Sequence, residues 1–341
     1  MAARSRAGTT TIVDIAAASA VSVATVSRIL NGKPDVAEET RARVLRVMEE
    51  FGFAPQSAWQ QIRSGRTRLI AMHVPQEFNP PHLRLIMAAA LGVEEAGYSI
   101  NIITRTLTDT ELLGIFRSRQ ADGIILLEIL ADDRRPELLR DQGYPFVMIG
   151  HRTDNGGLSF VDVDVSHGID LAIEHLVELG HQRTALLTVD PFVRDKTYGF
   201  ASWALEAYQR ACARNGVPAL VRVGGPTSEE LFEVAARLLE ENPDVTALIA
   251  LQEQSVVGII KAAQASGTRI PDELSVIGIV GDSMAEVATP PLTTISFPAE
   301  EMGERAARIL LERIDHKLAA PQQAYVEPTI TIRGSTGRAR S

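Results

Sequence analysis

The chain has 341 residues, 45% hydrophobic and 23% charged, which is ordinary for a globular protein of two or three folded units. Its net charge of −9 is uneven, because residues 1–66 hold nine basic and six acidic residues, a net of +3, and leave −12 on the rest. No apolar run approaches the roughly 20 residues of a membrane span, no secretory signal is evident, and the single cysteine, Cys212, excludes an internal disulfide, so we expect a cytoplasmic protein.

The first sixty residues predict helices and no strands. Thr11 can cap a helix over residues 12–18, and Ser22 can cap a second over residues 23–30. Only three residues separate the two, which is typical of a helix-turn-helix. The positive charge of this head indicates that it alone approaches a polyanion.

A third helix is expected over residues 37–51. Val44, Met48 and Phe51 share one of its faces, and Gly52 is placed to end it. We expect Val21, Val26 and Ile29 of the preceding segment to face the other helices.

From Leu69 onward, short apolar runs alternate with helical stretches. This alternation predicts parallel sheets with helices on both faces, divided into two lobes with a ligand cleft at the carboxyl ends of the strands. The expected strands are 69–74, 99–104, 123–127, 145–149, 184–188, 247–251 and 274–279. The expected helices include 83–96, 170–179, 200–215, 228–240 and 255–265, with Gly97, Gly180 and Gly216 as caps of the first three. The tail after Thr336, with its arginines, is expected to be solvated and disordered.

The second helix carries side chains suited to reading DNA. In a helix-turn-helix the first residues of this helix reach base edges in the major groove. Val23 and Ala24 can contact thymine methyl groups, and Arg28 can donate a forked pair of hydrogen bonds to guanine. Phosphate contacts are expected from Ser22, Thr25, Ser27 and Asn31.

Several motifs resemble the lactose-repressor/galactose-repressor (LacI/GalR) family over residues 10–336. They are Thr11–Ala16 followed by Val21–Gly32, Phe51–Pro55, His175–His181 and Pro290–Ile295. Ala20 stands where the family often has glycine. The resemblance implies a helix-turn-helix domain (1–55), a hinge (56–68) and a periplasmic-binding-protein-like body of two parallel-sheet lobes (69–341) that binds an effector and dimerises.

The resemblance also implies that the hinge becomes a helix on DNA and inserts an apolar wedge into the minor groove. Ile62 holds the wedge position, and Trp59 stands where a small residue is usual. Two wedges at one centre require a homodimer on a near-palindromic operator. The residues expected at the DNA are Thr11, Ser22, Val23, Ala24, Thr25, Ser27, Arg28, Asn31, Gln60, Ile62 and Arg63.

The effector cleft departs from the sugar-binding pattern of the family. Gly150, Gln252-Glu253 and Val280 replace common acids and amides, and Lys196 replaces an arginine. Basic residues nearby, together with His151, could bind an anionic or phosphorylated ligand. A sugar derivative or other ligand, and no ligand at all, are the two alternatives. The residues expected to line the cleft are Phe78, Asn79, Arg152, Arg194, Lys196, Gln252, Glu253, Val280 and Phe297.

Enzymatic interpretations find little support. His175 and His181 lie about 240° apart around a helix, which favours packing over a metal site with Glu178. A nucleophile elbow, a P-loop and a dinucleotide fingerprint are absent from the sequence. A solute receptor would have no use for the head, and a nonspecific DNA binder would not depend on Arg28. We therefore expect a repressor without enzymatic activity, metal or cofactor, acting as a homodimer at the bacterial nucleoid.

Overall fold

The computed structural model describes residues 10–30, 36–51, 53, 66–74, 80–189, 199–316 and 320–340. The chain divides into two compact units, of which one holds residues 1–69 with Arg119–Asp122 and the other holds the remainder. The three N-terminal helices, here called the head, and the two-sheet body are described separately. Among the described residues no single helix has the length and apolar character of a membrane span.

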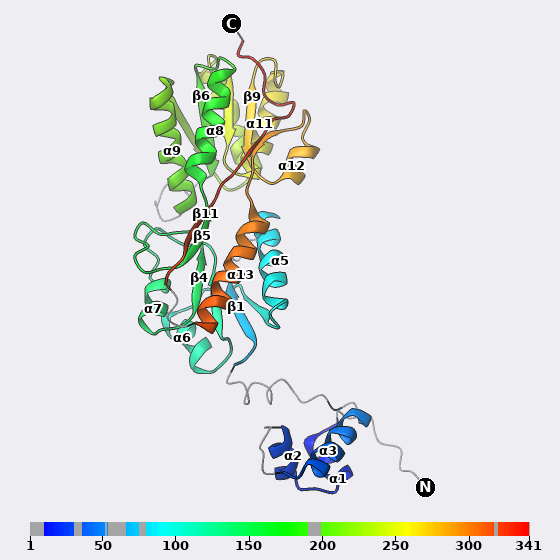
Figure 1. Ribbon diagram of the computed structural model, residues 1–341. Helices are drawn as coiled ribbons and strands as arrows, with labels where there is room; N and C mark the ends of the chain where they lie inside the picture. Colours follow the sequence, from blue (N-terminus) through cyan, green and yellow to red (C-terminus); the bar gives the residue numbers. More distant parts are fainter. Residues whose placement is uncertain are drawn as a thin grey trace. The chain divides into compact units, whose positions relative to one another are not determined.

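The head consists of α1 (Ile12–Ala18), α2 (Val23–Leu30) and α3 (Glu38–Glu50), drawn in blue in Figure 1. Thr11 and Asp14 form a reciprocal capping box at the start of α1, and their hydrogen bonds hold the pKa of the Asp14 carboxyl below its usual value. The Thr25 N–H donates to Ser22 Oγ at 3.0 Å, which confirms Ser22 as a cap. The axes of α1 and α2 are bent by 107°, within the range of helix-turn-helix motifs.

The core of the head is small and comes from all three helices. Its buried members are Ile15, Ala16, Val26, Ile29, Val44 and Met48. The prediction for Phe51 was wrong, because its side chain is 48% exposed and Phe53 packs against the core instead. Phe53 reaches that position because its N–H donates to Met48 O at 2.8 Å, which turns the chain back over α3.

The first lobe of the body has a six-stranded sheet in the order β11-β5-β4-β3-β1-β2. Its strands are β1 (Leu69–His73), β2 (Ser99–Ile103), β3 (Gly123–Leu126), β4 (Phe146–Ile149), β5 (Phe160–Val163) and β11 (Gln323–Val326). Its helices are α5 (Pro80–Glu94), α6 (Asp109–Arg117), α7 (Arg135–Asp141) and α13 (Ala299–Asp315). α5 and α13 lie side by side in Figure 1, and the ideal Cβ position at Gly303 would be 2.9 Å from Ala88 Cβ, so the helices pack closely.

The second lobe has a six-stranded sheet in the order β12-β10-β9-β8-β6-β7, parallel except for β12. Its strands are β6 (Thr184–Val189), β7 (Ala219–Gly224), β8 (Ala247–Ala250), β9 (Ser275–Ile279), β10 (Thr293–Ile295) and β12 (Ile330–Thr331). Its helices are α8 (Val165–Glu178), α9 (Gly199–Asn215), α10 (Ser228–Glu241), α11 (Glu253–Ser266) and α12 (Asp282–Val287).

The chain passes between the lobes three times, after β5, after β10 and after β11 (Figure 1). Apolar side chains from all three crossings, with Phe200 and Ile279, meet in a seam that leaves no room for a water molecule. An added Cβ at Gly168 would lie 2.9 Å from Ile295 Cγ2 and 3.1 Å from Pro328 Cγ, so only glycine fits there. The seam forms a pivot at one edge of both sheets.

The predicted two-lobed α/β body is confirmed, with all seven expected strands and all five expected helices present within a few residues. Gly97, Gly180 and Gly216 have positive φ values, as expected of helix caps. The strands β5, β7, β10, β11 and β12 and the helices α6, α7, α12 and α13 were not predicted from the sequence.

The expectation of a disordered tail was wrong, because the C-terminal segment is bound along the second lobe. Gly337 O accepts from His181 Nε2 at 3.1 Å, and His181 Nδ1 contacts Thr246 Oγ1 at 2.8 Å. His175 Nε2 contacts Thr336 Oγ1 at 3.0 Å. The two histidines of the family-like motif therefore hold the tail, and burial lowers the pKa of both imidazoles.

Candidate functional site

The second helix of the head presents one face to solvent. Val23 is 42% exposed, and Ser22, Ala24 and Arg28 are also exposed. Val26 and Ile29 on the opposite side are buried against α1 and α3, which fixes the orientation of the helix. Thr25 and Ser27 are half-buried between these two faces.

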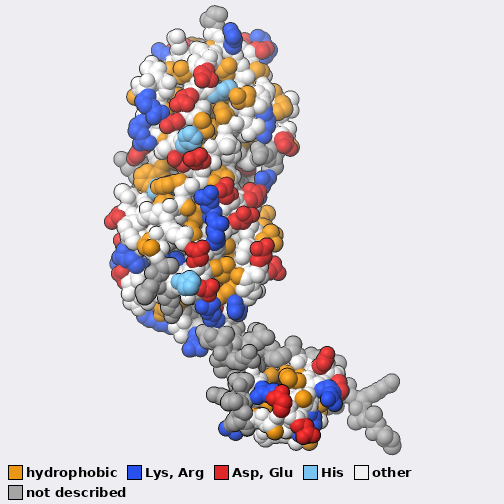
Figure 2. Space-filling view, in the orientation of Figure 1, with side chains coloured by type: hydrophobic (Ala, Val, Ile, Leu, Met, Phe, Trp, Pro, Cys, Tyr) orange, Lys and Arg blue, Asp and Glu red, His pale blue; other side chains and the backbone are white. Residues whose placement is uncertain are grey.

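The fold therefore brings together six of the residues expected at DNA, on α2 and its cap, and places Thr11 at the cap of α1. Asn31, Gln60, Ile62 and Arg63, with Trp59, lie outside the described residues. On the face of the body in Figure 2, basic and acidic side chains are intermixed. That face has no resemblance to the basic surface of a nucleic-acid-binding domain.

The turn between α1 and α2 explains the family's glycine at the position of Ala20. Ala20 has φ of 52°, in the left-handed region where a Cβ is unfavourable. Its side chain is exposed, so alanine meets no further obstacle there.

The carboxyl ends of the two sheets face one another across the pivot. Val163, Ile279 and Ile295, which end β5, β9 and β10, all line the seam. The neighbouring strands β1, β3, β4, β6 and β8 run parallel to these, so their carboxyl ends lie on the same side as the seam. We call the region between the strand ends of the two sheets the cleft. Ligands of open α/β sheets bind at such ends.

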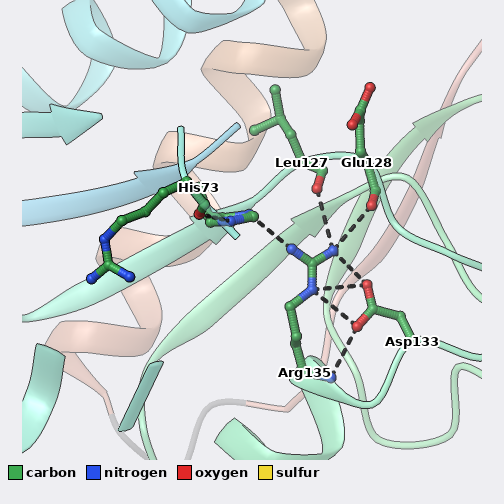
Figure 3. Close-up of polar contacts among 6 residues, drawn as sticks. His73, Leu127, Glu128, Asp133 and Arg135 are labelled. Carbon is green, nitrogen blue, oxygen red and sulfur yellow. Dashed lines mark hydrogen bonds and ion pairs between the residues drawn. The ribbon is translucent and has the colours of Figure 1, made fainter. Parts of the chain in front are cut away.

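The first lobe's side of this cleft is built on Arg135, at the start of α7 (Figure 3). Its guanidinium donates to both carboxylate oxygens of Asp133 and to Glu128 O at 3.0 Å. Its Nη1 donates to His73 Nδ1 at 2.8 Å, and His73 Nε2 then donates to Arg105 O at 3.0 Å. This network ties the ends of β1 and β3 together.

His73 is neutral in this arrangement, because its Nδ1 must accept a hydrogen bond from a cation. Burial, followed by the charge of Arg135, lowers the pKa of the imidazole. Neither His73 nor Arg135 was predicted to lie at the cleft, although a histidine at the end of a predicted strand was a usable signal, because ligands bind at strand ends.

The second lobe's side of the cleft carries Gln252 and Glu253 at the start of α11. Gln252 Oε1 accepts from Thr188 Oγ1 at 3.2 Å and from Val189 N–H at 3.3 Å, so the amide joins the ends of β6 and β8. Glu253 Oε1 is buried and has no hydrogen-bond partner among the residues that the structure describes. Burial raises the pKa of the Glu253 carboxyl, and the charge of Arg84 on α5 opposes this effect.

The remaining predicted cleft residues are placed as follows. Arg152 is 8% exposed, and its Nη1 lies 3.1 Å from Glu137 Oε1 on α7. Val280 is buried in the core of the second lobe, and Phe297 lies in the second crossing with its ring edge-on to Phe200. Phe78, Asn79, Arg194 and Lys196 lie outside the described residues.

The described cations near the cleft are paired with carboxylates. Besides Arg135 and Arg152, Arg84 Nη1 lies 3.6 Å from Glu300 Oε1, and the imidazole of His151 also meets a carboxylate, with its Nδ1 2.7 Å from Asp162 Oδ2. An anionic ligand would therefore have to compete with a resident carboxylate for each of these groups.

Comparisons with known proteins agree with both parts of the chain. A family model described as bacterial regulatory proteins, lacI family, matches residues 11–56, and one described as a periplasmic binding protein-like domain matches residues 173–336. The transcriptional regulator MalR of Streptomyces coelicolor is 33% identical over 97% of this chain and 98% of its own length. The regulator CelR of Thermobifida fusca is 29% identical over 94% and 96%.

Solved structures give the same result. A CelR–cellobiose complex is 28% identical and covers 96% of this chain and 99% of its own, with a TM-score of 0.71. The lac repressor dimer bound to operator and the anti-inducer ONPF has a TM-score of 0.83 over 97% of this chain and 100% of its own. At 22% identity, the second likeness concerns the fold alone.

The lowered pKa of His73 predicts a weaker body in acid. Because the folded-state pKa lies below the unfolded value of about 6.5, the stabilisation is complete above that pH and is lost as the pH falls. We expect His73→Asn, whose Oδ1 can replace the Nδ1 acceptor without titrating, to flatten the pH dependence of the free energy of unfolding. The slopes of the free energy of unfolding against pH for the variant and the unaltered protein are expected to differ by at most about 1.4 kcal/mol per pH unit.

Urea denaturation between pH 7.5 and 5 measures this effect. His167→Asn, on the exposed side of α8, is the matched control for the substitution itself. Identical slopes for His73→Asn and the unaltered protein would contradict the assignment.

Proposed function

Because the chain belongs to the lacI family of bacterial regulatory proteins, we propose that it is a DNA-binding transcriptional repressor controlled by a small molecule bound between its lobes. The proposal rests on the arrangement of α2. Its exposed face combines the small apolar side chains of Val23 and Ala24 with Arg28, while its other face packs in the core of the head. Such a regulator acts at the chromosome, so we expect it in the cytoplasm, at the nucleoid.

Each head reads one half-site of the operator. The first turn of α2 would lie in the major groove, where Val23 and Ala24 contact thymine methyl groups and Arg28 reads guanine. Ser22, Thr25 and Ser27 would bind the backbone on either side and set the register. Ile62 of the hinge is the residue that we expect to open the minor groove at the centre of the site.

Two heads on one operator require a dimer, and the first lobe has a surface that suits a second copy of this chain. Leu83, Met87 and Leu91 of α5 are 58%, 54% and 58% exposed. Their spacing of four residues places them on one side of the helix, opposite the face that packs on α13. Ile102, on the edge strand β2 of the same lobe, is a further exposed apolar side chain, at 46%.

The effector is proposed to be neutral and rich in hydroxyl groups. The arginines of the described cleft, Arg84, Arg135 and Arg152, are already paired with carboxylates, whereas no group among the described residues donates a hydrogen bond to the buried Oε1 of Glu253. A ligand hydroxyl would satisfy that oxygen without displacing a resident ion pair. The CelR–cellobiose complex is a relative with a ligand of this chemistry.

Arg28→Ala tests the DNA-reading role. Full-length protein is used to select duplexes from a random pool, and the affinity of each variant is then measured at two salt concentrations. We expect discrimination at one base pair to fall by roughly 1–3 kcal/mol, about 5- to 150-fold, while binding to unrelated DNA changes little. Arg237→Ala, on the exposed side of α10, removes the same charge from the body and should leave selectivity intact. If Arg28→Ala weakened all duplexes equally, Arg28 would be a phosphate contact.

Glu253→Ala tests the ligand chemistry. Thermal shifts are measured with cellobiose, ribose and ribose 5-phosphate. We expect a neutral sugar to raise the melting temperature and the variant to bind it roughly 10- to 100-fold more weakly, the loss of a hydrogen bond to a charged group. A shift with the phosphate alone would refute the neutral ligand and leave the DNA-binding function standing.

Met87→Glu tests the dimer. A charge in the middle of the α5 stripe would have to be desolvated when a second copy packs on it. We expect sedimentation to show a monomer where the unaltered protein is a dimer, and operator affinity to fall by at least tenfold. Ile332→Glu, a comparably exposed apolar position at 61%, is the control. A dimer that survives Met87→Glu would place the interface elsewhere.

A further inference from the structure

A histidine of the first lobe stacks on a tryptophan of the second. The ring centroids of His151 and Trp203 are 4.9 Å apart and their planes differ by 12°. His151 follows β4, and Trp203 lies in the first turn and a half of α9. The two rings therefore form a direct contact between the lobes, in addition to the three crossings.

The imidazole is held firmly by its own lobe. Its Nδ1 is 2.7 Å from Asp162 Oδ2 on β5, and the side chains of both residues are largely buried. The ring centroid of Phe160 lies 5.5 Å from that of the imidazole. The ring of Tyr325 on β11 meets the imidazole edge-on, with the centroids also 5.5 Å apart. His151 therefore moves with the first lobe.

The indole packs against the second lobe. Its Nε1 would be 2.8 Å from a Cβ at Gly199, so the ring lies directly against the backbone at the start of α9. That nitrogen is buried and makes no hydrogen bond to any described residue, so in the described part of the chain the indole is placed by packing. His151 O is also 3.3 Å from the same Cβ position, which shows how closely the lobes approach here.

The stack lies beside the pivot, next to a cavity that the seam does not fill. The seam itself is filled, but a cavity of about 160 Å³ adjoins the stack. Its walls are the first crossing, α9 and β11, and the residues are His151, Val163, Asp164, Val165, Ser166, Trp203, Glu206, Arg210 and Tyr325. A rotation about the three crossings would separate or slide the two rings beside this cavity.

We propose that His151 and Trp203 form an interlobe latch that holds the lobes in the arrangement seen here. Asp162 is a positioning residue, since it acts by fixing the imidazole. A stacked aromatic pair contributes modestly, which suits a contact that must open and close. The latch rests on the contact geometry, and its role in regulation rests on the proposed function.

The first test uses Trp59→Phe, which leaves Trp203 as the only tryptophan of the full chain. In this background, His151→Ala should shift the Trp203 emission to longer wavelength and raise its quenching by acrylamide. Hydrogen exchange at the three crossings should become roughly two- to tenfold faster, the range expected for loss of one stacked pair. His151→Phe, which keeps a ring without the hydrogen bond, should restore most of the protection, and Asp162→Asn should lie between.

The pattern of exchange distinguishes a latch from simple packing. Loss of packing alone would accelerate exchange throughout both sheets, whereas loss of the latch confines the change to residues 150–153, 163–166, 296–298 and 327–329. His167→Ala, exposed on α8, should change neither signal. Unchanged exchange at the crossings in His151→Ala, or acceleration spread over both sheets, would overturn the proposal.

The regulatory consequence has a separate readout. With duplexes selected by the protein, His151→Ala should alter the ratio of operator affinities with and without cellobiose at least threefold. If the protein selects no duplex, the proposed function fails while the exchange result still decides the latch. If duplexes and cellobiose both bind and the ratio is unchanged, the latch has no part in regulation.

Discussion

The packing of the three chain crossings at Gly168 is the constraint on which the body depends. Because α8 begins directly after the first crossing, it can approach Ile295 and Pro328 of the other two only where no Cβ intervenes. The resulting seam is apolar and full, so a change in the angle between the lobes would have to take place about it. A ligand that prefers one angle between the lobes can then shift the whole body by its difference in affinity for the two angles.

Local patterns in the sequence were sufficient for the centre of each sheet and insufficient for its edges. The strands that were predicted are short apolar runs such as Gly123–Leu126 and Ala247–Ala250, buried on both faces. The missed strand β5 contains Asp162, which interrupts the apolar run, although β11 pairs with it in parallel across 163 residues of sequence. β12 has only two residues and exists because β10 is already in place. Strands of this kind are defined by their partners and carry little signal of their own.

The DNA-reading face of α2 and the cleft also differ in how far each could be predicted from local sequence. The face of α2 could be predicted because caps, turn and buried positions all lie within twenty residues, and a period of 3.6 decides which side chains are exposed. The cleft could not, because its charges are neutralised by residues that the fold brings from elsewhere. Arg152 meets Glu137, and Arg84 of α5 meets Glu300 of α13. A count of basic residues suggested an anionic ligand, and the pairing removes that argument for the residues described.

Two polar side chains to which no role could be assigned from the sequence, His181 and Arg135, join segments that are distant along the chain. His181 joins β8, β9 and the tail through Thr246, Ser275 and Gly337, and Arg135 joins the ends of β1 and β3. Buried hydrogen bonds of this kind contribute little individually, but losing one partner leaves the others unsatisfied. They therefore specify one arrangement of each lobe, and rigid lobes are what allow a small change at the cleft to appear as a rotation at the pivot. The stack of His151 on Trp203 differs because it joins the lobes to each other, and a contact between two rigid bodies can break without unfolding either of them.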